Sequence, residues 1–120
     1  MKFTNLVGLA LAAALVVPAA AKAADAPAAF APCKACHKTE AGGKGVGPSL
    51  FGVVGRKAGS LDGYNYSPAM KSFGKAWDVA SLTSYIQDPK AVVPGNKMPF
   101  AGIKDAAKAK EVADYLATLK

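Results

Sequence analysis

The sequence has few of the residues that usually carry protein chemistry. It contains two cysteines, Cys33 and Cys36, and one histidine, His37, and all three lie in the stretch CKACH. A structural zinc site takes four Cys or His ligands, so only an added carboxylate could complete one here. Two cysteines this close together also close no loop that a disulfide would stabilise usefully. A thioredoxin-like dithiol shares the C-x-x-C spacing, but it requires a βαβ pattern that is missing here.

A membrane-length hydrophobic run is also absent. The N-terminal apolar run, residues 6–17, has 12 residues, and a membrane-spanning helix needs about 20. Pro18 ends this run, and Ala21-Lys22-Ala23 fits the A-x-A pattern that signal peptidase recognises. We therefore predict a cleaved signal peptide at residues 1–23, with an uncleaved anchor as the alternative. The mature chain, residues 24–120, is then one domain that works in the periplasm.

Acidic residues are scarce. The chain has 8 Asp and Glu against 15 Lys and Arg, and removing residues 1–23 takes away two lysines and no acid, which leaves 13 − 8 = +5. A nucleic-acid partner is a poor interpretation for an exported protein. An acidic protein surface or an anionic membrane surface fits the charge better, and a charge that serves only solubility is the alternative.

The patterns that are present indicate helices joined by loops. Glycine and proline are dense from residue 42 to 63, strand signals are weak, and Asp78 and Asp105 are placed as N-caps of two amphipathic helices. The predicted helices span residues 26–37, 67–73, 78–88 and 105–120. Pro32 is awkward inside the first helix, and Pro89 ends the third. We expect an all-α domain of three to five helices that needs an additional hydrophobic centre, because a small loop-rich chain buries little by itself.

The stretch CKACH supplies a candidate for that centre. In an exported protein, C-x-x-C-H is typical of covalent haem attachment. Residues three and four apart share one face of a helix, so both thiols can bond to the haem vinyl groups while His37 reaches the iron. Because the chain has no second histidine, a methionine is the natural sixth ligand of the iron. Met98 lies in a loop bracketed by glycine and proline and is favoured, whereas we interpret Met70 as core filler.

The chain resembles class I cytochrome c, the small type that includes mitochondrial cytochrome c and bacterial cytochrome c2. The likeness runs through CKACH, GVGPSLFGVVGRKAG, GYNYSPAMKSFGKAW, SLTSYIQDPKAVVPGNKMPFAGIK and VADYLATLK. It implies that His37 and Met98 are the axial ligands of one haem c attached to Cys33 and Cys36. It also implies a bond from His37 to the carbonyl of Pro48.

The resemblance assigns further roles around the haem. Tyr85 would place its hydroxyl near the sulfur of Met98, and Phe100 would cover the haem edge. Buried haem propionates need donors and positive charge, a role implied for Arg56, Tyr66 and Trp77. The pocket would be lined by Leu50, Leu82 and Leu116.

Three positions depart from the family pattern. Ala26 stands where a glycine usually lets the first helix cross the last one closely. Met70 replaces an asparagine near the inner propionate. Asn96 replaces a threonine in the ligand loop, and we expect it to donate to a propionate.

The implied function is electron transfer without catalysis, by a monomer. Expected partners are acidic docking surfaces of a bc1-type complex, an oxidase, a photosynthetic reaction centre or a reductase. Steering is expected from Lys34, Lys44, Lys90 and Lys97. A haem peroxidase or gas-binding cytochrome is the alternative, and it requires Met98 to dissociate easily.

Overall fold

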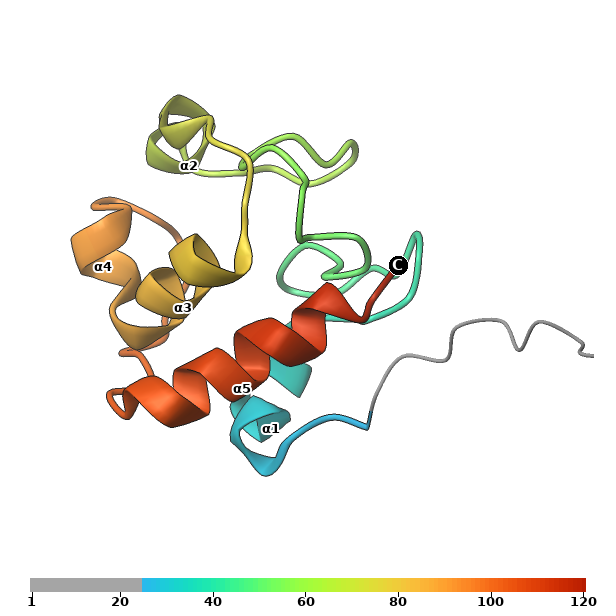
Figure 1. The fold of residues 1–120 in the computed structure, drawn as a ribbon. Coiled ribbons are helices and arrows are strands. Elements are labelled where there is room, and N and C mark those ends of the chain that lie inside the picture. The colour runs from blue at the N-terminus through green and yellow to red at the C-terminus, as the bar shows by residue number, and fades with distance from the viewer. Residues whose placement is uncertain (1–24) are drawn as a thin grey trace, which may run out of the picture.

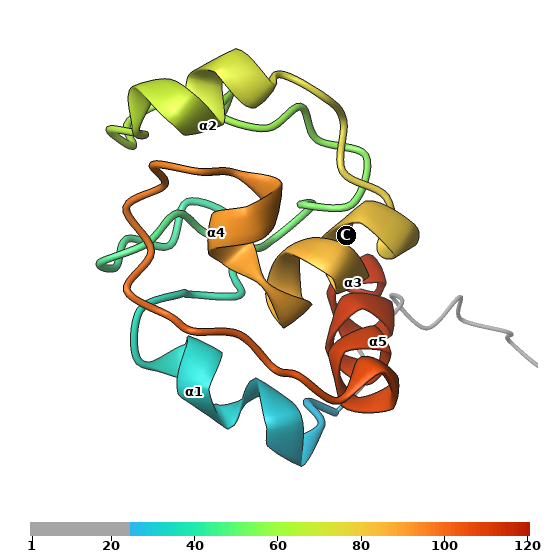
Figure 2. The same cartoon turned by 90° about the vertical axis from the view of Figure 1, so that its left-hand side faces the viewer.

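The computed structural model describes residues 25–120 and confirms the all-α prediction. Its elements, in chain order, are the 3-10 helix η1 (Ala28–Phe30) and the helices α1 (Ala31–Lys34), α2 (Pro68–Phe73), α3 (Val79–Gln87), α4 (Pro89–Val92) and α5 (Ala106–Ala117). Figure 2 shows these elements arranged in a ring, with α2 and α1 at opposite ends. Within the described residues the only β-like pairing is an isolated bridge between Lys57 and Ala76. None of the helices in this part of the chain is long and apolar enough to cross a membrane.

The predicted signal peptide, residues 1–23, lies outside the described residues. The domain assignment that depends on it therefore stays a prediction.

The helix starts follow the capping residues in the sequence. Asp78 and Ser81 form a capping box at α3, in which each side chain bonds to the backbone N–H of the other residue at 2.6 and 3.0 Å. Asp105 accepts two backbone N–H groups at the start of α5. Ser67 caps α2 by accepting the N–H of Met70 at 3.1 Å. The predictions for these three helices are confirmed to within a few residues.

Prolines shape the chain near two of the predicted helices. The first segment splits into η1 and α1, and Pro32 occupies the first turn of α1, where its missing N–H removes no helical bond. Pro89 ends the pattern of α3 as predicted, but it also begins α4, a short helix that the sequence patterns did not indicate. Asp88 caps α4 by accepting the N–H of Ala91 at 3.2 Å.

The first and last elements pack together, because η1 contacts both α5 and α1. In Figure 1 this N-terminal segment, coloured blue, lies below α5. Phe30 in η1 is 0% exposed, and its ring lies 5.0 Å from the ring of Tyr115 at an interplanar angle of 60°. Ala26, which stands in place of the family's glycine, is partly buried against this core. Contact between the chain's two ends is thus retained without the glycine.

The segment from α4 to α5 runs along one side of the ring (Figure 2). It approaches the end of α3 closely, because the N–H of Ile103 donates to the carbonyl of Ile86 at 2.9 Å. Gly102 has a φ of +111°, and a Cβ there would overlap the carbonyl oxygen of Gln87. Only glycine fits this crossing. The crossing fixes the path of the loop that carries Met98.

Candidate functional site

A single cavity of about 230 Å³ brings together the residues predicted from the sequence. Its lining includes every predicted site residue: Cys33, Cys36, His37, Pro48, Arg56, Tyr66, Trp77, Tyr85, Asn96, Met98 and Phe100. Much of the remaining wall is apolar, and the three predicted leucines, Leu50, Leu82 and Leu116, belong to it.

Cys33 reaches the cavity from α1, and Cys36 and His37 reach it from the turn that follows. The N–H groups of Cys36 and His37 both donate to the carbonyl of Cys33, at 3.2 and 2.9 Å, so the turn places the three side chains close together. Both thiols are free and partly buried. Burial raises the pKa of the Cys33 thiol, and the neighbouring Cys36 raises it further. Cys33 therefore does not resemble an activated thiolate.

His37 is held in one tautomer. Its Nδ1 lies 2.8 Å from the carbonyl oxygen of Pro48, and since a carbonyl only accepts, Nδ1 carries the proton. Burial lowers the pKa of His37; the Pro48 bond opposes this shift and the charge of Arg56 adds to it. The ring is therefore neutral with a lone pair on Nε2, which is the form that binds a metal. Gly47 lies against this ring, because a Cβ there would stand 2.5 Å from Cε1.

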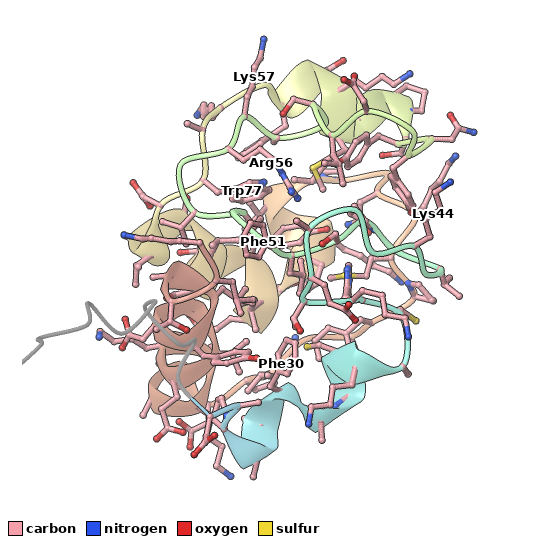
Figure 3. The ribbon with its side chains drawn as sticks, turned by 90° about the vertical axis from the view of Figure 1, so that its right-hand side faces the viewer. Phe30, Lys44, Phe51, Arg56, Lys57 and Trp77 are labelled. Atoms are coloured by element: carbon pink, nitrogen blue, oxygen red, sulfur yellow. The ribbon has the colours of Figure 1, made fainter. Side chains whose placement is uncertain are left out.

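A cation and several hydroxyl and ring N–H donors gather at another part of the wall. The guanidinium of Arg56 donates to the carbonyls of Ser49 and Phe51 at 2.9 and 3.3 Å, and its burial lowers its pKa. In Figure 3 Arg56 and Trp77 point into the molecule, whereas Lys44 and Lys57 point away from it. A partly buried cation next to N–H and O–H groups suits a ligand that carries carboxylates.

Aromatic rings pack on both sides of Trp77, which belongs to this part of the wall. Trp77 lies between Phe73 and Tyr85, with ring centroids 5.1 Å away on each side. The hydroxyl of Tyr66 accepts the N–H of Leu61 at 3.3 Å. Burial raises the pKa of Tyr85 to about 12, and Tyr64 contributes to that shift. Tyr85 therefore stays a neutral phenol in the cavity and is able to donate a hydrogen bond.

Met98 reaches the cavity from a tight turn after α4. The residues Val93-Pro94-Gly95-Asn96 form a type II turn, in which Gly95 has a φ of +87° and the N–H of Asn96 donates to the carbonyl of Val93 at 3.1 Å. The side chain of Asn96 bonds to three backbone groups: the carbonyls of Pro89 and Val93 and the N–H of Met98. The expected bond from Asn96 to a propionate stays a prediction, and the structure shows the amide with other partners.

Taken together, these groups fit a haem. The cavity offers two thiols, a neutral imidazole with Nε2 available, a thioether, apolar walls and a cationic end. The model of the family described as cytochrome c matches residues 23–120. The chain belongs to the cytochrome c family. Cys33 and Cys36, at the C-x-x-C-H spacing, accordingly carry one covalent haem c.

Bacterial cytochromes c2 are among the relatives of this cytochrome c. The chain is 59% identical over 98 residues to cytochrome c2 iso-2 of Magnetospirillum molischianum, which covers 81% of this chain and all of that protein. It is 53% identical over 97 residues to cytochrome c2 of Rhodoplanes tepidamans, covering 80% of this chain and 99% of that protein. Among solved structures, cytochrome cH from Methylobacterium extorquens superposes with a TM-score of 0.70 at 54% identity, over 75% of this chain and 91% of that one.

Sequence reasoning missed several supports of the haem cavity. Tyr64 lines it and influences Tyr85, but nothing in its spacing distinguishes it from a surface tyrosine. Ser49 is buried and binds the carbonyl of Glu40 at 2.6 Å, which ties down the loop that carries Pro48. Gly47 was also missed, and the only sign of it in the sequence is the run of glycines before Pro48. The His37 ring lies too close to residue 47 for any side chain, so this position requires glycine.

The four lysines predicted to steer partners, Lys34, Lys44, Lys90 and Lys97, are all exposed. Lys97 also lines the cavity, and its ammonium donates to the carbonyl of Asn65 at 3.2 Å. Val46, another lining residue, is 73% exposed. An exposed apolar side chain and an exposed lysine that both line the cavity are compatible with docking, which stays a prediction.

Proposed function

We propose that this cytochrome c is a periplasmic one-electron carrier whose haem iron is ligated by His37 and Met98. The observation that carries the proposal is that one cavity brings together both thiols, the neutral imidazole and the thioether from segments 61 positions apart in the chain (98 − 37). When bound, the haem supplies an iron that alternates between Fe(III) and Fe(II).

The protein holds both proposed ligands through its own backbone. Pro48 fixes the tautomer and orientation of His37, and a bond of this kind raises the basicity of a ligand. The turn before Met98 fixes the path of the chain that presents the thioether. Ligands that are already fixed need not rearrange when the charge of the iron changes, which favours fast electron transfer.

The cavity wall affects the reduction potential of the haem and the cost of burying its propionates. Apolar residues exclude water and disfavour the more highly charged Fe(III) state, and a methionine ligand acts in the same direction by raising the potential. The Arg56 guanidinium, with Tyr66 and Trp77 beside it, offers donors to the propionates, whose burial would otherwise be costly. Tyr85, a neutral phenol, is able to donate to the sulfur of Met98.

The proposed partners follow from charge. The exposed Lys34, Lys44, Lys90 and Lys97 would guide a monomer to the acidic docking surfaces of a bc1-type donor and of an oxidase, reaction centre or reductase as acceptor. Periplasmic location depends on the signal peptide expected at residues 1–23.

Substitution of the two methionines tests the ligation. Oxidised wild-type protein should show the weak absorption band near the red end of the visible spectrum that is typical of an Fe–S(Met) bond. Met98→Ala should abolish this band. Met70→Leu, which changes the other methionine that lines the cavity, should keep it. The reverse pattern would assign the iron to Met70 and contradict the proposal.

Three further measurements separate the carrier from other functions. Haem that stays with the denatured, reduced protein is covalently attached, and haem that is released contradicts a C-x-x-C-H attachment. A wild-type protein that lacks the band at neutral pH and turns over peroxide would be the peroxidase or gas-binding cytochrome considered above. Rates of electron transfer to acidic acceptors that fall steeply with salt would support the carrier.

A further inference from the structure

Asn96 stands between α4 and Met98 and bonds to both. Its Oδ1 accepts the N–H of Met98 at 2.8 Å, and its Nδ2 donates to the carbonyls of Pro89 at 3.0 Å and Val93 at 2.9 Å. We infer that Asn96 is a positioning residue that holds Met98 on the iron and sets how readily an external ligand displaces it. The inference rests on the proposed ligation by Met98.

The two carbonyls that Asn96 binds belong to buried residues. Pro89 and Val93 are both among the most fully buried residues, and the N–H of Val93 donates to the carbonyl of Pro89 at 2.9 Å. The carbonyls of Pro89 and Val93 each already accept one backbone N–H, and the amide of Asn96 gives each of them a second donor. Through Oδ1 the same side chain fixes the backbone of Met98. Met98 is therefore tied to the buried residues Pro89 and Val93 through one amide group.

Among small polar side chains, only that of asparagine can make all three of these bonds. A side-chain amide has two N–H donors and a carbonyl acceptor, and all three are used here. Serine or threonine has one O–H donor, so it can serve only one of the two carbonyls while it accepts from Met98. Aspartate keeps the acceptor and the shape but has no donor when ionised, and it would place a negative charge against two carbonyl oxygens.

The turn leaves little freedom to compensate for a lost bond. Gly95 approaches α2, because a Cβ at that position would stand 3.4 Å from the Cβ of Ala69. On the other side of the ligand, the N–H of Phe100 donates to the carbonyl of Met98 at 2.9 Å. Any displacement of Met98 from the iron that moves its backbone would break the bond to Asn96. Asn96 should therefore oppose displacement of Met98 directly.

The test uses holoprotein and free imidazole as the competing ligand. Asn96→Asp should bind imidazole to the ferric protein about fivefold to a hundredfold more tightly than the wild type, since each lost buried hydrogen bond changes an equilibrium by roughly that factor. Asn96→Ser should lie between the two. Hydrogen exchange of the Met98 amide should accelerate in the same order. The matched control is Asn65→Asp, which adds the same charge at an exposed position near Lys97 and should stay within about twofold of the wild type.

The outcomes distinguish the inference from the proposed function on which it rests. If Met98→Ala abolishes the Fe–S(Met) band while both Asn96 variants bind imidazole like Asn65→Asp, Met98 is the ligand and the inference about Asn96 is wrong. If Met98→Ala keeps the band, the ligation itself fails. A lower urea midpoint without a change in imidazole affinity would show a merely structural role and also overturn the inference. Should Asn96→Asp yield no holoprotein, Asn96→Ser decides.

Discussion

Substituting Gly47 by alanine should disturb the iron ligand without touching the iron. A Cβ at residue 47 would stand 2.5 Å from Cε1 of His37, and ordinary contact begins at 3.4 Å. The ring, or the loop that carries residue 47, must therefore move by 3.4 − 2.5 = 0.9 Å. A displacement of that size along the bond would lengthen the Nδ1 to Pro48 oxygen distance from 2.8 Å to beyond the limit of about 3.2 Å for a hydrogen bond.

The expected result of Gly47→Ala is a higher reduction potential. The bond to Pro48 makes His37 a stronger electron donor, which favours Fe(III), so weakening it favours Fe(II). A neutral hydrogen bond contributes about 1 kcal/mol, and 1.4 kcal/mol corresponds to about 59 mV for one electron. Because part of that bond energy is common to both oxidation states, we expect a rise of about 20–40 mV. A redox titration measures this shift, and NMR of the Nδ1 proton reports the bond itself.

Gly63→Ala is the matched control. Gly63 has a φ of +84° and no atom within 4 Å of its Cβ position, so alanine there adds backbone strain of about 1 kcal/mol without contacting His37. It should lower the urea midpoint and leave the potential unchanged. An unchanged potential in Gly47→Ala with its Nδ1 bond intact would refute the reasoning, as would an equal shift in Gly63→Ala.

Three further predictions concern stability and docking. Phe30→Ala should cost about 3–5 kcal/mol of unfolding free energy in a urea titration, because it removes a fully buried ring from its contact with Tyr115, and a loss below 1 kcal/mol would contradict this packing. Bonds from Ser81 lower the pKa of Asp78 below 3.8, so its contribution to stability is complete above that pH and is lost as the pH falls through the lowered value. Asp78→Asn caps without titrating, so its urea midpoint should fall less steeply below pH 4 than that of the wild type, and parallel curves would exclude this role. Lys97→Gln should slow association with an acidic redox partner in stopped-flow kinetics and flatten its salt dependence, whereas Lys108→Gln on exposed α5 surface should not; equal effects would indicate a response to net charge alone.

Local chemistry made the helices and the site residues predictable. Asp78 and Asp105 mark helix starts because their carboxylates accept N–H groups that no helix can satisfy internally, and the structure has both caps. The spacing of Cys33, Cys36 and His37 indicates one haem, since it depends only on the pitch of a helical turn. The grouping of all predicted site residues around one cavity came from the family resemblance, because local patterns do not specify which loops meet in space.

What the sequence could not predict depends on contacts between distant segments. The short helix α4 has four residues, too few for a hydrophobic period to be recognised. The bonds from Asn96 to the carbonyls of Pro89 and Val93 were not predicted, because they form only when the turn brings residue 96 back against α4. Tyr64 acquires its influence on Tyr85 only when two segments 21 positions apart (85 − 64) meet in the folded chain.

The packing of Phe30 against Tyr115 also has a consequence for biosynthesis. The two rings are separated by 85 positions (115 − 30), so the first helical elements gain their partner only when the last helix of the chain has been made. Without α5, Phe30 lacks the ring of Tyr115 that packs against it. A chain truncated before residue 115 keeps Cys33, Cys36 and His37 but should fail to close around the haem.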